Sequence, residues 1–371
     1  MDMPRVLSVN EAFFPHEGGA EKRAYEILSR LGKRGFDVSV ATNPFPGKEE
    51  VQGLDIEYIT NLKESNYFKK NSRRLLGVNH FSSSVRKYVR DHRRDFDIFN
   101  FDEFPLIHAL KGVRELTDRK TAFFTWHEVL RQFYAEKGFP WKIAASWEKQ
   151  VSQEFRHHIT VSSTISKLLS SIYSVHDSVV IQNGVNRKEF QNSYEKEWGK
   201  IVYVGRLEPH KRLDKMIEIF KKESDLQLQI IGAGSQLKYL KSMVNGNNNI
   251  KILGHVDKSQ LLEEVKHSWL FVMPSYREGF SIASLEAMAA SVPVLTVDSS
   301  FNYAANEIVR DGYNGIISSD FSDMITRIRG LYKDEDGWRA MSKNAYDFTS
   351  DYDWDNIADK LANLYLSSWS A

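Results

Sequence analysis

Short apolar runs, glycine-containing loops and stretches of helical spacing alternate along the 371-residue chain, and this alternation constrains the fold more than any other feature. At the start, residues 6–9 form an apolar run, Gly18-Gly19 interrupts it, and residues 20–31 carry apolar side chains at helical spacing. Residues 36–40 then begin a second strand. Strands joined by a helix pair in parallel, so this order predicts an α/β domain with a doubly wound parallel sheet.

The same order continues through the first half of the chain and then begins again in the second half. The polar stretch 187–200 between the two series is predicted to be a linker. Other predicted strands lie at 97–99, 121–125, 159–162, 201–205, 226–231, 250–254, 270–274 and 293–297, and helices at 141–155, 213–220, 261–267 and 282–290. We therefore expect domains at 1–182 and 183–350 and a packed terminal helix at 351–371. Ligands of such sheets bind beyond the carboxyl ends of the strands, where the chemistry is to be sought.

Composition excludes several classes of function. Fifty Lys and Arg against 49 Asp and Glu give a net charge of +1, which argues against a partner that is nucleic acid. The absence of cysteine excludes disulfide frameworks, cysteine zinc sites and thiol catalysis. The chain lacks an apolar run of the ~18 residues that a membrane span needs, and its N-terminus lacks a signal pattern. We expect a cytoplasmic protein, with peripheral attachment to the inner face of a membrane left open.

The densest group of polar residues follows the predicted strand 270–274. Glu278 and Glu286 flank a turn in which Gly279, Phe280 and Ser281 offer backbone N–H groups at a helix start, which attracts anions. Two carboxylates on the order of 10 Å apart can hold hydroxyl groups at opposite ends of a diphosphate-linked molecule. The alternative is a pair of solvated glutamates. Glu286, however, lies in a largely apolar helix, where a carboxylate without partners is costly, so we favour a ligand site.

This segment resembles the E-x7-E signature of the retaining glycosyltransferases of family 4 (glycosyl transferases group 1). That family has the GT-B fold, in which two Rossmann-like domains face a central cleft and the C-terminal helix returns to the N-terminal domain. Further segments resemble the family's motifs in the same order along the chain. They are Glu17-Gly18-Gly19-Ala20-Glu21, Thr125-Trp126-His127-Glu128, Gln182-Asn183-Gly184-Val185, Val204-Gly205-Arg206-Leu207-Glu208 with Lys211, Ile231-Gly232-Ala233-Gly234 and Leu253-Gly254-His255-Val256.

The resemblance implies a role for each matched residue. Arg206 and Lys211 would neutralise the diphosphate leaving group. His127 would lie against the donor sugar, Glu278 would hold that sugar's hydroxyl groups, and Glu286 would hold the ribose. The other implied donor-binding residues are Gly18, Gly19, Gly205, Gly232, His255, Val256, Gly279, Phe280 and Ser281.

The resemblance also implies the reaction: transfer of a sugar, with retention, from a UDP- or GDP-linked donor bound by the C-terminal domain. The acceptor, a lipid, a glycan or another hydroxyl compound, would be presented by the N-terminal domain, and neither a cofactor nor a metal ion is implied. Two rival functions stay open. One is an epimerase or hydrolase of nucleotide sugars on the same fold, and the other is a non-catalytic nucleotide- or sugar-binding protein.

Several patterns carry less weight when taken alone. Lys211-Arg212 is a common surface pair, and an isolated histidine such as His127 is more often structural. The D-x-D pattern of Asp95 to Asp97 is typical of a metal site in another glycosyltransferase fold, but it recurs near the C-terminus, and we infer no metal from it. His157-His158 is interpreted as a surface pair.

A basic stretch runs from Lys63 to Arg94. It holds ten Lys and Arg against Glu64 and Asp91, with aromatic and aliphatic residues between them. Such a stretch can bind an anionic membrane surface or an anionic acceptor head group. The alternative is a solvated helical face, and the two interpretations are evenly balanced.

Overall fold

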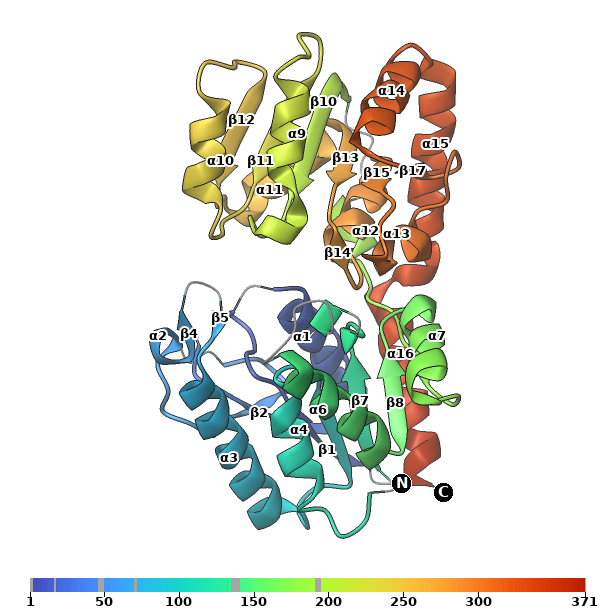
Figure 1. Cartoon of the computed structure of the whole chain (residues 1–371). Coiled ribbons are helices and arrows are strands. Elements are labelled where there is room, and N and C mark those ends of the chain that lie inside the picture. The colour runs from blue at the N-terminus through green and yellow to red at the C-terminus, as the bar shows by residue number, and fades with distance from the viewer. Residues whose placement is uncertain are drawn as a thin grey trace. The chain divides into compact units, whose positions relative to one another are not determined.

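The computed structural model describes residues 3–16, 18–45, 50–69, 72–119, 121–131, 133–134, 141–190 and 195–370. The chain folds into two units, shown in Figure 1. Unit 1 comprises residues 1–183 together with 354–371, and unit 2 comprises residues 184–353.

Unit 1 is built on a seven-stranded sheet with the order β3-β2-β1-β6-β7-β8-β9, in which all neighbouring strands are parallel. The strands are β1 (Arg5–Val9), β2 (Asp37–Thr42), β3 (Asp55–Tyr58), β6 (Ile98–Asp102), β7 (Ala122–Trp126), β8 (His157–Thr160) and β9 (Val179–Val180). A short antiparallel hairpin, β4 (Phe68–Lys69) and β5 (Ser72–Arg73), lies outside this sheet. Strand order reverses direction between β1 and β6, which places a crevice at the carboxyl ends of these two strands.

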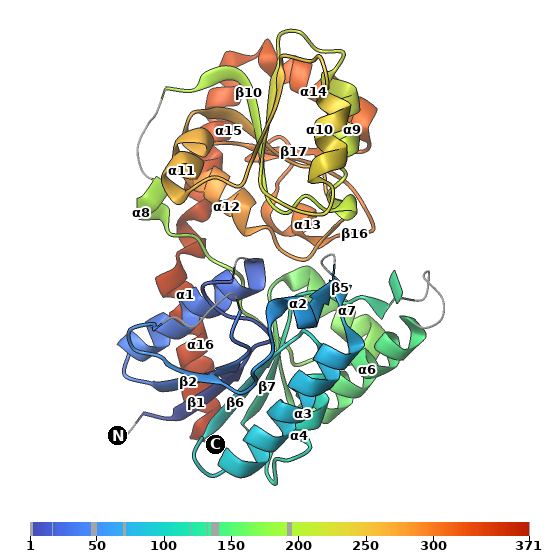
Figure 2. The same cartoon turned by 90° about the vertical axis from the view of Figure 1, so that its left-hand side faces the viewer.

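Helices cover both faces of the unit 1 sheet (Figure 2). The helices of this unit are α1 (Gly19–Lys33), α2 (Glu64–Tyr67), α3 (Leu75–His92), α4 (Leu106–Val113), α6 (Trp141–Glu154), α7 (Ser163–Tyr173) and α16 (Trp354–Trp369). Successive residues of β7 show the two faces: the Phe123 ring contacts Tyr365 of α16, whereas the Phe124 ring contacts Phe155, just after α6. This alternation follows from the two-residue period of a strand and explains why β7 is buried throughout.

Unit 2 repeats the architecture with a six-stranded parallel sheet of the order β12-β11-β10-β13-β15-β17. Its strands are β10 (Glu197–Val204), β11 (Gln227–Ile231), β12 (Ile250–Gly254), β13 (Ser268–Met273), β15 (Val294–Val297) and β17 (Gly315–Ser318), with a separate short pair, β14 (Arg277–Glu278) and β16 (Phe301–Asn302). Here the direction of strand order reverses between β10 and β13. A second crevice is therefore expected at their carboxyl ends.

Apolar side chains of α9, α10 and α14 join those of the strands in one buried cluster of unit 2. The helices of this unit are α8 (Arg187–Phe190), α9 (Leu213–Phe220), α10 (Leu237–Val244), α11 (Lys258–Lys266), α12 (Ile282–Ala289), α13 (Tyr303–Ile308), α14 (Phe321–Tyr332) and α15 (Glu335–Phe348), with 3-10 turns η1 (Pro209–Lys211) and η2 (Thr349–Tyr352). Among the helices in the described part of the chain, none is long and apolar enough to cross a bilayer.

The C-terminal helix α16 belongs to unit 1 although the chain reaches it from unit 2, as the family resemblance implies. It packs against α1 (Figure 2). Arg34, directly after α1, pairs with Asp359 at 2.6 Å and with Asp355 at 3.5 Å. Tyr365 of α16 is fully buried in the unit 1 core. The helix thus contributes core side chains as well as surface ion pairs.

Two expectations from the sequence are corrected by the structure. The expected linker at 187–200 contains α8 and the first four residues of β10, because Glu197 starts pairing with β13 at Ser268; residues 191–194 lie outside the described residues. His158 is not on the surface. It is 3% exposed on β8, and its Nδ1 accepts a hydrogen bond from Trp126 Nε1 at 3.0 Å. Burial lowers the pKa of His158 to about 4.

The buried His158 predicts an acid-sensitive fold of unit 1. Unfolded, the imidazole binds a proton below a pKa near 6.5, whereas in the folded protein it stays neutral down to about pH 4. The stability that the fold gains from a neutral His158 is therefore complete above pH 6.5. As pH falls toward 4, the free energy of unfolding decreases by about 3 kcal/mol on account of this residue. In His158→Asn, the free energy of unfolding, measured by denaturant titration, should fall less steeply over this range than in the parent. Equal slopes would contradict the assignment.

Candidate functional site

The carboxyl edge of the unit 2 sheet brings together most of the residues that the sequence singled out. Arg206 and Lys211 follow β10, Gly232 follows β11, His255 follows β12, and Glu278 follows β13. Because the strands are parallel, all these loops leave the sheet at the same edge. Lys211 and Glu278, on the loops after β10 and β13, are 67 residues apart in the sequence and form an ion pair. They meet where the direction of strand order reverses.

The Lys211–Glu278 pair is mostly shielded from solvent, with 13% and 17% of the two side chains exposed. Lys211 lies in η1, and Glu278 lies in β14, which pairs with β16 and so holds the loop in place. The hydroxyl of Ser275 lies 3.4 Å from the same carboxylate oxygen. The ammonium and carboxylate are thus placed side by side, one suited to a phosphate oxygen and the other to a sugar hydroxyl.

His210, next to Lys211, is a site residue that the sequence did not single out. Burial, together with the positive charges of Lys211, Arg277 and Arg206, lowers the pKa of His210 to about 3. Its carbonyl oxygen accepts a hydrogen bond from the backbone N–H of Tyr276 at 2.8 Å, which joins the loops after β10 and β13. Burial is the larger cause, and the three neighbouring cations add to it. Arg277, one of these cations, was also not predicted.

Glycines allow the loops after β10, β11 and β12 to lie against one another. Gly232 has φ +139°, and a Cβ there would meet the carbonyl oxygen of Gly205 at 1.9 Å. A Cβ on Gly234 would meet the backbone of Leu207 at 2.5 Å, and Gly232 N donates to the carbonyl of Gly254 at 2.8 Å. Gly232, which was predicted to bind the donor, is therefore first of all required by backbone packing, which shapes the cation-bearing loop.

The remaining donor-binding candidates of unit 2 lie on the same edge. Gly279, Phe280 and Ser281 are buried at the start of α12, where the Ser281 hydroxyl caps the helix by accepting from Ser284 N at 3.2 Å. Glu286 is half-buried on the second turn of α12. His255 is exposed and Val256 half-buried, directly before Asp257, the N-cap of α11.

In unit 1, the carboxyl edge holds a histidine–aspartate pair. His127 follows β7, and its Nε2 lies 2.6 Å from Oδ1 of Asp102, the last residue of β6. Burial alone would raise the pKa of Asp102, but the charges of His127 and Arg23 outweigh it and hold that pKa below its usual value. Asp102 therefore stays ionised and fixes the orientation of the imidazole. Sequence reasoning missed Asp102, which lies three residues beyond the strand predicted at 97–99.

Two further buried groups support this pair. A Glu103 carboxylate oxygen accepts the backbone N–H of His127 at 2.5 Å and that of Glu128 at 2.8 Å, and burial raises the pKa of Glu103 well above its ordinary value. Arg23 of α1 donates to the carbonyl of Gln182 at 2.7 Å and to the side-chain oxygen of Asn183 at 2.9 Å. Asn183, the first residue of the Asn-Gly-Val segment predicted at the domain junction, is thus held in unit 1 by a buried guanidinium.

Gly18 and Gly19 lie at the start of α1, after β1, on the same edge of unit 1. Gly18 is the N-cap with extended backbone, and a Cβ on Gly19 would meet no atom within 4 Å. Neither residue is held to glycine by a positive φ. Glu17 of the same motif lies outside the described residues.

The D-x-D residues of unit 1 take part in ion pairs. Asp97 pairs with Arg5, and Asp95 pairs with His92. Across the described ranges, no three His, Asp or Glu side chains come together in a way that could hold a metal ion.

Comparison with known proteins now gives the family. The model described as Glycosyl transferases group 1 matches residues 185–348, and the model described as Glycosyltransferase Family 4 matches residues 17–189. An uncharacterized glycosyltransferase of Methanocaldococcus jannaschii, MJ1607, is 30% identical, with 94% of each chain covered. The chain belongs to the group 1, family 4 glycosyltransferases.

Other relatives of this glycosyltransferase match over different lengths. The O-antigen chain mannosyltransferase RfbU of Salmonella typhimurium is 24% identical, with 92% of this chain and 99% of RfbU covered. A second uncharacterized glycosyltransferase of M. jannaschii, MJ1178, is 28% identical over 51% of this chain. That match spans 53% of the length of MJ1178, about half of the relative.

Solved structures confirm the GT-B fold of the glycosyltransferase. Sucrose-phosphate synthase from Thermosynechococcus elongatus superposes with a TM-score of 0.82 at 17% identity, covering 99% of both chains. HepE of Anabaena, in complex with UDP, gives 0.76 at 16% identity, covering 98% of this chain and 100% of that one. The family and the fold predicted from the sequence motifs are both confirmed.

The packing of the glycine loops predicts opposite outcomes for two alanine substitutions. Gly232→Ala places a methyl group against the backbone of Gly205 and should abolish binding of UDP and GDP in a thermal-shift assay, because the loop that carries Arg206 must move. Gly19→Ala has space for its methyl group at a helix start and should leave the free energy of unfolding within about 0.5 kcal/mol of that of the parent. Nucleotide binding by Gly232→Ala equal to that of the parent would contradict this account of the loop.

Proposed function

We propose that this glycosyltransferase moves a sugar from a UDP- or GDP-linked donor to a hydroxyl group of a glycan or lipid acceptor, with retention at the anomeric carbon. The observation that carries the proposal is the Lys211–Glu278 pair at the point where strand order reverses, with Arg206 on the same loop and the start of α12 beside it. Such a site can receive a pyrophosphate and the sugar attached to it.

In the proposed reaction, the bond between the anomeric carbon and the phosphate oxygen breaks, and its electron pair goes to the leaving diphosphate. Arg206, Lys211 and backbone N–H groups at residues 279–281 stabilise the charge that develops there. The acceptor oxygen bonds to the anomeric carbon, and its proton passes to the departing phosphate. Atoms and charge then balance without a carboxylate nucleophile.

Three residues, Glu278, Glu286 and His127, are proposed to bind the sugar and the ribose of the donor. Glu278 accepts hydrogen bonds from sugar hydroxyls and Glu286 from the ribose hydroxyls. His127 contacts the sugar. Asp102 is a positioning residue that binds Nε2 of His127 and so fixes the orientation of the imidazole. This leaves Nδ1 as the atom that would contact the donor.

Removal of the cations should abolish transfer while leaving the fold intact. Lys211→Ala and Arg206→Ala should each lower the rate of sugar transfer by ~10²–10³-fold, because each removes a charge that stabilises the leaving diphosphate. The measurement is release of UDP or GDP from a panel of nucleotide sugars, with and without acceptor extracts.

The matched control is Lys215→Ala, a lysine on α9 that pairs with Glu218 in solvent. It should retain parental activity. Full activity of Lys211→Ala or Arg206→Ala would contradict the proposed role, and release of nucleotide that is independent of any acceptor would favour a hydrolase instead.

We also propose a lipid-binding surface on unit 1, formed around the most exposed leucines of the described residues. Leu75 and Leu76, at the start of α3, are 80% and 85% exposed, and we call them the leucine pair. Arg74 and Lys63, both exposed, lie in the same part of unit 1. We propose that the leucine pair enters an anionic lipid surface while these cations contact its head groups.

Two arginines of the basic stretch are engaged in ion pairs within unit 1. Arg73 pairs with the buried Glu11 at 2.5 Å, and Arg86 pairs with Glu115 at 2.5 Å. Lys70 lies outside the described residues, as does the side chain of Lys69. Since Glu11 follows β1 closely, the Arg73–Glu11 contact places the hairpin before α3 near the carboxyl edge of the unit 1 sheet, where an acceptor attached to lipid would be needed.

Vesicle binding tests the leucine pair. Substitution of both leucines by serine should weaken co-sedimentation with vesicles of phosphatidylglycerol and phosphatidylcholine at least tenfold, because each buried leucine contributes about 1.5–3 kcal/mol. Ile143→Ser, which removes an exposed aliphatic side chain from α6 of the same unit, should bind like the parent. Equal binding by the double variant and the parent would refute the proposal.

A further inference from the structure

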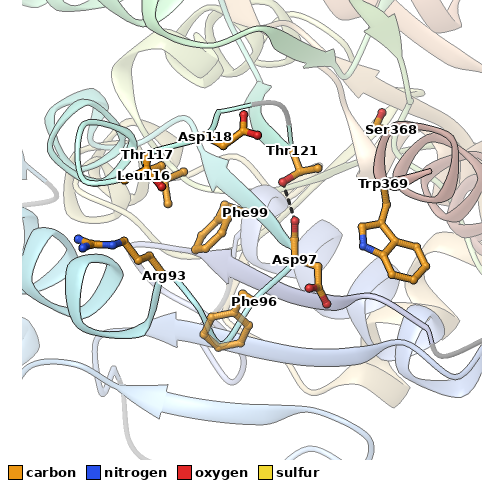
Figure 3. Close-up of a pocket in the computed structure, with 10 residues that line it drawn as sticks. All are labelled: Arg93, Phe96, Asp97, Phe99, Leu116, Thr117, Asp118, Thr121, Ser368 and Trp369. Carbon is orange, nitrogen blue, oxygen red and sulfur yellow. Dashed lines mark hydrogen bonds between the residues drawn. The ribbon is translucent and has the colours of Figure 1, made fainter. Parts of the chain in front are cut away.

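A pocket of about 270 Å³ lies on unit 1, away from the residues described so far. It is formed at the amino ends of β6 and β7, by the end of α3, the segment after α4 and the last turn of α16 (Figure 3). Its lining residues are Arg93, Phe96, Asp97, Phe99, Leu116, Thr117, Asp118, Thr121, Ser368 and Trp369. His127 and Asp102 lie at the opposite edge of the same sheet, about 15 Å away along five-residue strands.

One wall of the pocket is held in place by contacts within unit 1. Arg5 donates to the Asp97 carboxylate from its backbone N at 2.9 Å and from its guanidinium at 3.1 Å, and this pairing keeps the pKa of Asp97 below its usual value. The Thr121 hydroxyl donates to the Asp97 carbonyl at 2.5 Å. Phe96 and Phe99 pack edge to face at 6.1 Å. These groups are therefore already in position for a ligand.

The opposite wall includes Trp369, on the last turn of α16. Its side chain is 38% exposed, and Figure 3 shows the indole on one side of the pocket and Arg93 on the other, with Asp97 and Phe99 between them. An indole left in contact with water at a pocket rim loses the stabilisation that burial would give it. A ligand seated in the pocket would cover part of this ring.

The lining combines aromatic faces with carboxylates, hydroxyl groups and a guanidinium. A sugar ring matches both kinds of group, because its C–H faces pack on aromatic rings while its hydroxyls donate to carboxylates and accept from Arg93. Because Arg5 pairs with Asp97, two carboxylates are balanced by two guanidiniums, and the lining has no net positive charge to hold an anion such as a phosphate. The chemistry of the lining thus favours a neutral, polyhydroxylated ligand.

We propose that this pocket binds a neutral sugar residue of a glycan acceptor at a distance from the hydroxyl that is glycosylated. The proposal rests on the proposed function, since it assumes that the acceptor is a glycan. Its consequence is a preference for acceptors long enough to reach from one edge of the unit 1 sheet to the other, and weak binding of glycans without any donor.

Saturation-transfer NMR on the full chain tests the pocket with three neutral probes: maltotetraose, α-1,6-linked mannotetraose and chitotetraose. We expect at least one probe to bind the parent and to bind Trp369→Ala roughly tenfold more weakly, because the indole face is lost. A second variant, Thr117→Trp, adds bulk from an exposed position in the lining and should also weaken binding. Tyr239→Ala, which removes an exposed aromatic ring of α10 in unit 2, should bind like the parent.

Two results would overturn the proposal: no binding of any probe by the parent, or parental binding by both pocket variants. Thermal shifts with UDP and GDP compounds, recorded on the same proteins, separate this proposal from the proposed function. Sugar binding without any response to nucleotides would support the proposed sugar pocket and refute the proposed donor site. A nucleotide response without sugar binding would refute the pocket alone.

Discussion

Parallel strand pairing is the constraint on which the rest of this structure depends. In each unit it sends every loop that follows a strand to one edge of the sheet, so residues far apart in the sequence meet there. Lys211 and Glu278 form an ion pair across 67 residues because β10 and β13 are neighbours in the sheet. In unit 1 the neighbouring strands β6 and β7 bring Asp102 to His127 in the same way. Both meeting points lie at or beside a reversal of strand order, where ligands of such sheets bind.

The two edges differ in electrostatic character. On unit 2, Arg206, Lys211 and Arg277 lie near one another around His210, and this group of cations suits phosphates. On unit 1, Asp102 stays ionised beside His127. Glu103 there has a raised pKa and holds backbone N–H groups. A polar edge of this kind suits hydroxyl groups better than phosphates. The difference follows from neighbouring side chains and not from the fold, which is the same in both units.

The strands and helices, which depend on the local sequence pattern, were mostly predicted from the sequence. Side-chain roles that depend on contacts between distant segments were missed. Glycine loops and apolar runs located most strands, and α9 was predicted with its observed bounds. The pattern could not show that His158 accepts from Trp126, because strand register brings the two together. Asp102, Arg23 and His210 were missed for the same reason: each acquires its role from a partner on another element. The basic stretch 63–94 looked continuous, yet Glu11 and Glu115 from elsewhere in unit 1 pair with two of its arginines.

Because α16 returns to unit 1, this unit is built from two separate segments of the chain, residues 1–183 and 354–371. Tyr365 and Trp354 are buried in its core, and Asp355 and Asp359 pair with α1. During synthesis the first 183 residues leave the ribosome long before the helix that covers one face of their sheet. The part of that face that α1 does not cover therefore stays exposed while all of unit 2 is made. Unit 2, made of one uninterrupted segment, is free to fold first, which reverses the order in which the two are translated.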